Sequence, residues 1–183
     1  ATTNNNVTGA TFTPGFMTYY LHVRSACGGS TFSNWTTLAF VANDNASGAM
    51  MLTVNGGCSG NIYNNTAASQ ATGEPYPSCN DYSMGHHTVW FKFLAPPSGA
   101  VRISTDLLPA GTHQDTKIGL FSATDSSNYA TFNIIACDED GGVNIQYNST
   151  VFAVGLTPGT AYYVQVDGWS AADSGTFCLT VDS

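Results

Sequence analysis

Basic residues are scarce in this sequence. Its 183 residues include only four lysines and arginines against twelve aspartates and glutamates, which gives a formal net charge of −8. Recognition of nucleic acid and electrostatic anchoring to anionic lipid both need several cations on one face. The composition therefore argues against both kinds of partner, and cations are the more natural small ligands.

Long apolar runs and catalytic motifs are missing too. No apolar stretch approaches the roughly 18 residues of a membrane-spanning helix, so we expect no membrane insertion. No signal peptide is visible, and if the protein is exported, we expect its signal to have been removed or to lie outside this sequence. The sequence also shows no G-x-S-x-G, H-E-x-x-H or P-loop pattern. We therefore expect a protein that is not an enzyme.

Charged residues make up only 9% of the chain, and Thr, Ser, Asn and Gly, which favour strands and turns, supply the polar surface. Apolar residues alternate with polar ones at the period of a β-strand, and no amphipathic helix stands out. Strands are expected at residues 7–12, 18–25, 35–42, 49–54, 88–95, 100–106, 117–122, 131–137, 149–155, 161–167 and 175–181. Many short strands at this spacing predict an all-β sandwich.

Two segments of the chain resemble each other. A Thr-Pro-Gly turn precedes Tyr19, and a second one precedes Tyr162. Each tyrosine is placed like that of a tyrosine corner, whose hydroxyl bonds to backbone upstream of it. Two corners imply two units, and we place them at residues 1–42 and 43–183, with the break at residues 42–48.

The first unit is incomplete. Residues 1–42 supply only three of the expected strands, whereas residues 43–183 supply enough for a closed sandwich. The three strands present an apolar face that includes Tyr19, Leu21 and Val23 and has no second sheet to cover it. A flat apolar face of this kind needs a partner.

The cysteines point to an oxidising compartment. They lack C-x-x-C spacing, which disfavours zinc and favours disulfides, and we expect an extracellular or cell-surface protein. We predict that Cys58 pairs with Cys79, closing a Gly- and Asn-rich excursion, and that Cys137 pairs with Cys178, because both lie in expected strands. Cys27 is then left over, and it is either free or bonded to a partner outside this sequence.

Further motifs follow the first unit in a fixed order. They are Pro-Ser-Cys at 77–79, His-Thr-Val-Trp-Phe-Lys-Phe at 87–93, Asp-Thr at 115–116, Ala-Cys-Asp-Glu-Asp-Gly-Gly at 136–142, the second Thr-Pro-Gly turn and Gly-Thr-Phe-Cys-Leu at 175–179. In this order they resemble the bacterial pre-peptidase C-terminal domain. Residues 13–40 resemble the last three strands of a fibronectin type III domain, as in large proteins exported by the type IX secretion route.

The resemblance implies a jelly-roll-like β-sandwich with an additional short N-terminal three-strand β unit. It also implies a non-catalytic accessory module beside other modules of secreted proteases, adhesins and surface proteins.

An acidic turn is the main candidate for a metal site. Asp138 and Asp140 lie in an Asp-Glu-Asp-Gly-Gly turn, with Asn144 just beyond it and Asp115 at the start of a neighbouring expected strand. Calcium binds several oxygen ligands, and a carboxylate-rich loop bent by glycines can bring them together. The alternative is a solvated acidic turn without an ion.

Aromatic residues suggest a second kind of site. Trp169, in an Asp-Gly-Trp-Ser loop, is the best candidate for stacking on a sugar ring, whereas Trp90 lies in a dense apolar run and is expected in the core. Adjacent residues on a strand point to opposite faces, so the neighbouring His86 and His87 are not expected to chelate one metal.

The function that we expect is a structural or adhesive module of a bacterial surface protein. The incomplete first unit favours assembly with other protein chains or surface modules, for example as a homopolymeric filament subunit completed by a strand from a neighbouring chain. The alternatives are a fragment of a longer chain and an accessory module of a secreted hydrolase that binds glycans or matrix.

Overall fold

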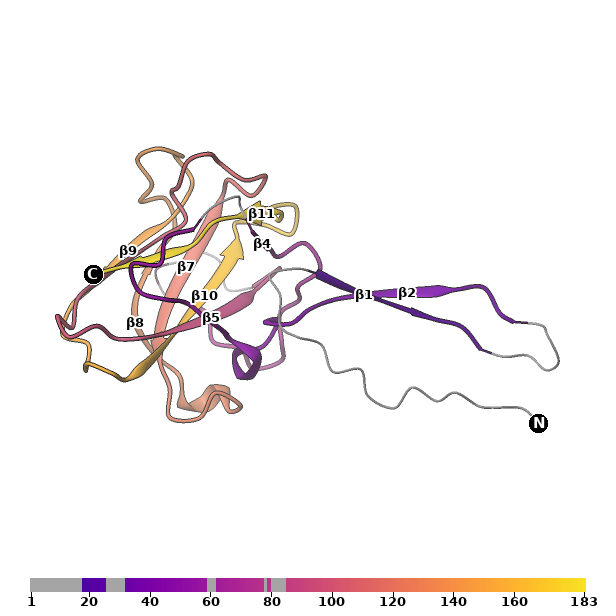
Figure 1. Ribbon diagram of the computed structural model, residues 1–183, viewed down its shortest axis with the longest axis horizontal. Coiled ribbons are helices and arrows are strands. Elements are labelled where there is room, and N and C mark those ends of the chain that lie inside the picture. The colour runs from indigo at the N-terminus through magenta and orange to yellow at the C-terminus, as the bar shows by residue number, and fades with distance from the viewer. Residues whose placement is uncertain (1–17, 26–31, 59–61, 78, 80–84) are drawn as a thin grey trace.

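The computed structural model describes residues 18–25, 32–58, 62–77, 79 and 85–183, in which nearly all regular structure is β-strand (Figure 1). The strands are β1 (Thr18–Val23), β2 (Thr36–Val41), β3 (Met50–Met51), β4 (Tyr63–Asn64), β5 (Val89–Leu94), β6 (Val101–Ser104), β7 (Thr116–Ser122), β8 (Asn133–Asp138), β9 (Thr150–Ala153), β10 (Ala161–Gly168), β11 (Thr176–Phe177) and β12 (Thr180–Asp182). Two short 3-10 helices, η1 (Ala46–Gly48) and η2 (Tyr129–Thr131), complete the elements. The predicted all-β fold is confirmed, and the described ranges hold no helix with the length and hydropathy to span a bilayer.

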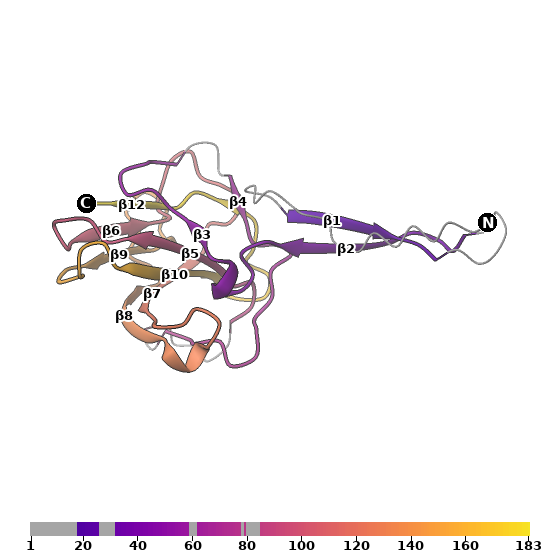
Figure 2. The same cartoon turned by 60° about the horizontal axis from the view of Figure 1, so that its bottom comes forward.

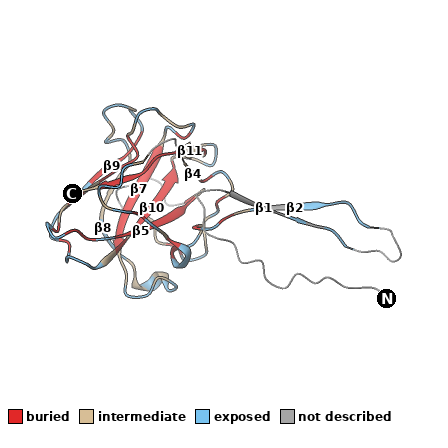
Figure 3. Ribbon diagram, in the orientation of Figure 1, coloured by how far each residue is buried: buried red, intermediate tan, exposed pale blue. Residues whose placement is uncertain are grey.

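Two larger sheets form the body of the protein, and a short pair of strands, β4 and β11, accompanies them. One of the larger sheets has the strand order β3-β5-β10-β7-β8 and the other the order β12-β6-β9. Because alternate side chains of a strand point to opposite faces, each sheet offers one apolar face to the other. Phe91 and Val164 from the first sheet and Ile103 from the second belong to one buried cluster, so the body is a sandwich (Figure 3).

A second, smaller apolar cluster covers the outer face of the five-stranded sheet. Trp90 of β5 is fully buried in it, together with Phe121 of β7 and Ala46 of η1. The rings of Tyr129 and Phe132 pack against the indole of Trp90. Strand β5 is therefore buried on both faces, which accounts for its nearly continuous apolar sequence.

A buried carboxylate joins the chain before β5 to this outer face. Glu74 accepts hydrogen bonds from the indole N–H of Trp90 and from the hydroxyl of Thr88 at 2.9 Å. It also accepts them from the side-chain amide of Gln165 at 3.2 Å and from the backbone N–H of Ala71 at 2.7 Å. Burial raises the pKa of Glu74 against the opposing effect of these bonds. The donors offset part of the cost of burying the carboxyl group.

Strands β1 and β2 form an antiparallel hairpin that extends away from the sandwich in both views (Figures 1 and 2). Thr18 lies opposite Val41 at the base of the hairpin, and Val23 lies opposite Thr36 at the other end. The predicted third strand of this unit, at residues 7–12, lies outside the described residues.

The base of the hairpin is fixed to the sandwich. Val41, at the end of β2, is buried in the main core. The backbone N–H of Trp90 donates to the carbonyl of Asn43 at 2.8 Å, and the side-chain amide of Asn43 donates to the carbonyl of Trp90 at 2.9 Å. Ala46 is fully buried. The segment predicted as the break between two units, residues 42–48, is therefore attached to the sandwich through Asn43 and Ala46.

All four cysteines of the predicted disulfides are bonded, but the predicted pairing is wrong. Cys58 bonds Cys178 with 5.7 Å between Cα atoms, and Cys79 bonds Cys137 with 6.0 Å. The first bond follows from the pairing of β11 with β4, which brings the chain after β11 beside the chain before β4. Cys27 lies outside the described residues.

The strands differ from prediction in three places. The expected strand at 175–181 is split into β11 and β12, which belong to different sheets. Strand β4 was not predicted, because its two residues are too few to show an alternation of apolar and polar side chains. The expected strand at 49–54 shrinks to β3 because the chain turns at Asn55, whose φ is 59°.

The hydroxyl of Tyr162 makes the bond expected of a tyrosine corner. It accepts a hydrogen bond from the backbone N–H of Thr157 at 3.0 Å, which ties the turn before β10 to the strand itself. The ring of Tyr162 stacks on Phe93 with 6.1 Å between centroids. The side chain of Tyr19, the other predicted corner, lies outside the described part of the structure.

We predict that Tyr162→Phe lowers the free energy of unfolding by about 1 kcal/mol, because the N–H of Thr157 loses its partner while the ring stays in place. Urea denaturation measures the change. The matched control is Tyr163→Phe, since the ring of Tyr163 packs on Phe132 on the opposite face of β10. Equal effects of the two substitutions would contradict a specific role of the Tyr162 hydroxyl.

Candidate functional site

The predicted calcium ligand Asp138 accepts hydrogen bonds from backbone N–H groups of its own chain. Its Oδ2 atom accepts hydrogen bonds from the N–H of Gly141 at 2.9 Å and from the N–H of Thr150 at 2.7 Å. The first bond shapes the acidic turn, and the second joins the end of β8 to the start of β9. Asp138 thus holds its turn and two strands together.

The predicted ligand Asn144 is bonded to a buried carboxylate that sequence reasoning missed. The side-chain amide of Asn144 donates to Asp106 at 3.1 Å. Asp106 also accepts the backbone N–H groups of Val143 at 2.8 Å and Ile145 at 2.7 Å. Burial acts to raise the pKa of Asp106, but the hydrogen bonds outweigh it and leave this pKa below its usual value.

The other two predicted ligands are Asp115 and Asp140, and the negative charge of Asp140 acts on Asp115. The pKa of Asp115 is raised to about 6, first by burial and then by the negative charges of Asp173 and Asp140, against the opposing charge of Lys117. Asp115 and Asp173 line a surface depression of about 430 Å³ beside the exposed ring of Tyr147. We call Asp115, Asp140 and Asp173 the acidic face.

The structure does not assemble the four predicted calcium ligands into one cluster. In the ranges it describes, no group of three or more His, Cys, Asp or Glu side chains is arranged to hold a metal ion. Calcium binding by Asp115, Asp138, Asp140 and Asn144 therefore stays a prediction.

Trp169, the predicted stacking residue, is half-buried beside a buried cation. The ammonium group of Lys117 lies 5.9 Å from the Trp169 ring centroid and 5.1 Å from that of Tyr76. It donates to the hydroxyl of Tyr76 and to the carbonyl of Trp169. Burial lowers the pKa of Lys117, against the raising effect of nearby acids such as Asp167. The indole of Trp169 therefore helps to enclose Lys117.

The histidines take structural positions. The backbone N–H groups of His86 and His87 donate to the buried carboxylate of Asp167 at 3.0 and 2.8 Å. Burial lowers the pKa of His113 to about 4, so this imidazole is neutral at physiological pH. The Nε2 atom of His113 lies 3.1 Å from the carbonyl oxygen of Asp115 and orders the chain at the edge of the depression.

The far end of the hairpin carries an exposed cluster of one cation and two aromatic rings. The guanidinium carbon of Arg24 lies 3.9 Å from the centroid of Phe32 and 4.4 Å from that of Trp35. Phe32 is 49% exposed and Trp35 is 59% exposed. The N–H of Ser33 donates to the carbonyl of Ser25 at 2.9 Å, which holds the two sides of the hairpin together here. We call Arg24, Phe32 and Trp35 the hairpin cluster.

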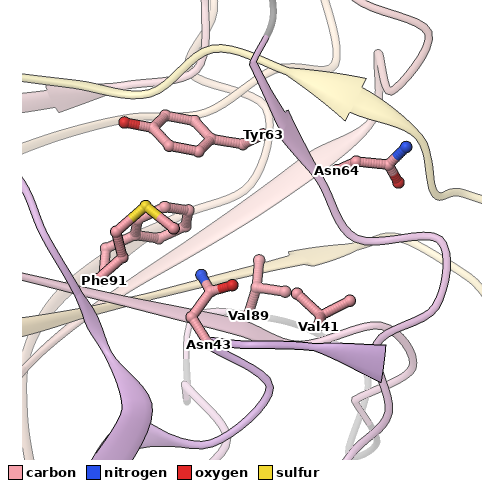
Figure 4. A pocket seen from close by; sticks show the side chains of 7 residues that line it. Val41, Asn43, Tyr63, Asn64, Val89 and Phe91 are labelled. Carbon is pink, nitrogen blue, oxygen red and sulfur yellow. The ribbon is translucent and has the colours of Figure 1, made fainter. Parts of the chain in front are cut away.

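A small cavity lies where the hairpin enters the sandwich (Figure 4). It measures about 10 Å³ and lies among Val41, Asn43, Tyr63 and Phe91. This volume is about that of a single water probe, so the cavity is a packing defect and is too small for an organic ligand.

Three comparisons were made between the chain and known proteins. No protein-family model, no curated protein and no solved structure matches it. The resemblance to the pre-peptidase C-terminal and fibronectin type III domains therefore stays a prediction, and we infer the function from the contacts described above.

We predict that Asp106→Asn lowers the free energy of unfolding by about 1–3 kcal/mol at neutral pH, because the backbone N–H groups of residues 143–145 lose a charged acceptor. A carboxyl whose pKa is lower in the folded state stabilises the fold above its unfolded pKa, and this stabilisation disappears as the pH falls through the folded value. The difference between the wild type and the variant should therefore shrink below about pH 4.

Urea denaturation across a pH series measures this difference. Asp125→Asn is the control, because Asp125 is exposed and its carboxylate bonds only Ser127 among the described residues, so its substitution should leave the midpoint almost unchanged. A difference between the wild type and Asp106→Asn that persists at acidic pH would show that the charge of Asp106 is not the cause.

Proposed function

We propose that this chain is a non-catalytic extracellular structural or adhesive module of a surface protein, and that its hairpin joins neighbouring chains by strand completion. The observation that carries the proposal is the hairpin itself. It extends away from the sandwich (Figure 2), and in the described ranges β1 and β2 pair only with each other. Among the described residues, both strands therefore have an edge that another chain could pair with.

The sequence of the hairpin supports pairing with a further strand. Exposed edges are commonly protected by lysine, proline or inward-pointing charge. The strands read Thr-Tyr-Tyr-Leu-His-Val and Thr-Thr-Leu-Ala-Phe-Val, with no lysine, proline or acid among them. A two-stranded hairpin is only marginally stable alone, and a strand from another chain adds main-chain hydrogen bonds.

The roles of the buried carboxylates support a structural function. Glu74, Asp106 and Asp167 each accept several hydrogen bonds from groups of their own chain and hold loops to strands. Two disulfides fit an oxidising, extracellular environment. These features favour a rigid body that presents the hairpin.

We predict that the hairpin amides become protected from hydrogen exchange as the concentration of the intact protein rises. Pairing with a neighbouring chain would bury edge N–H groups of β1 or β2, whereas β10 lies between two strands of its own sheet and is protected at every concentration. Exchange followed by mass spectrometry, with sedimentation on the same samples, measures this. Hairpin exchange that is independent of concentration, in a chain that stays monomeric, would contradict the proposal.

A further inference from the structure

The hairpin holds its cluster away from the body of its own chain. Val41 is buried in the main core, and Val23 and Thr36 form the pair at the other end of the two strands. Five residues of extended chain separate that end from Val41, about 17 Å at the usual rise per residue. Arg24 and Trp35 follow directly beyond it.

The chemistry of the cluster is that of a protein contact. Tryptophan and arginine are the residues most enriched among those that dominate binding energy in interfaces. Here the rings of Phe32 and Trp35 flank the guanidinium of Arg24 and restrict its motion before any partner arrives. A pre-ordered side chain loses less entropy on binding.

The distribution of charge selects the partner. Arg24 is the only charged residue among residues 1–42, whereas residues 43–183 contain all twelve acids and the other three bases, a formal net charge of −9. A single cation at the end of an otherwise uncharged arm is complementary to that body. Every copy of this chain carries both an arm and an acidic body, so a second copy is always present as a complementary partner.

The acidic face is a part of the body that would gain from a nearby cation. The negative charges of Asp173 and Asp140 help to raise the pKa of Asp115, which means that these carboxylates repel each other. The adjoining depression and the exposed ring of Tyr147 give room and apolar surface for aromatic rings.

We propose that the hairpin cluster of one copy docks on the acidic face of a second copy, with Arg24 facing Asp115, Asp140 and Asp173. This proposal rests on the proposed function and specifies which two surfaces meet. The cluster and the face are different surfaces of one chain, so a docked pair keeps one cluster and one face free. Such a head-to-tail contact propagates unless it closes into a ring.

Sedimentation velocity of the intact chain over a concentration series, at low and high salt, tests the contact. Arg24→Glu and Trp35→Ala should each weaken self-association by about tenfold or more, and high salt should weaken the wild type. Lys92→Glu makes the same change in net charge on the body and should leave self-association unchanged. Far-UV circular dichroism and thermal unfolding of each variant establish that it is folded.

Complementary variants give the sharper result. Asp140→Arg reverses the charge of an exposed residue of the acidic face and should also self-associate poorly. An equimolar mixture of Arg24→Glu and Asp140→Arg should associate again, because each variant keeps the surface that the other lacks. A mixture that stays monomeric, or an Arg24→Glu variant that associates like the wild type, overturns the proposed contact.

The outcomes separate this contact from the proposed function. If Arg24→Glu associates normally and its hairpin amides still become protected with concentration, strand completion stands and the docking of the cluster on the acidic face is wrong. If the wild type stays monomeric at every concentration, both are wrong.

Discussion

The packing of Trp90 on the outer face of the five-stranded sheet determines where the hairpin points. Its backbone N–H and carbonyl are both bonded to Asn43, two residues after the end of β2, and its indole N–H is bonded to Glu74. The same ring is covered by Ala46 and by the aromatic rings near η2. Because the chain that leaves the hairpin is fixed at Trp90, the hairpin extends from a rigid base, and the position of everything at its far end depends on this one contact.

The strand pattern was readable from the sequence wherever a strand has one face in the core, as for β6 and β9, or is apolar throughout, as for β5. The disulfide pairing was not readable, because it depends on which strands become neighbours. Cys178 meets Cys58 through the pairing of β11 with the two-residue β4, which has no alternation to detect. Cys79 meets Cys137 because the chain after Glu74 crosses the outer face of the sheet towards β8, where Pro77 lies over Gly119. A linear pattern carries no information about such a crossing.

The candidate sites divide in the same way. The acidic turn and Asp115 were visible as an excess of carboxylates, and in the structure the charge of Asp140 helps to raise the pKa of Asp115. Asp173, the third member of the acidic face, follows β10 and has no signal of its own in the sequence. The hairpin cluster was missed because Phe32 and Trp35 meet Arg24 only across the two sides of a hairpin. These residues are candidates for binding because they are exposed, and exposure cannot be read from the sequence.

The length of the hairpin has an electrostatic consequence for assembly. Bodies with a formal charge of −9 repel each other, and direct contact between two of them would bring like charges together. Salt at physiological strength screens charges beyond about 8 Å, whereas the strands of the hairpin extend about 17 Å from the core. In the proposed contact, an arm without acidic residues fills the gap and places its one cation against the next acidic face. In that contact the same separation would keep the repulsion between bodies weak, so the strongly acidic sandwich and the nearly neutral hairpin would act as complementary parts of the proposed head-to-tail unit.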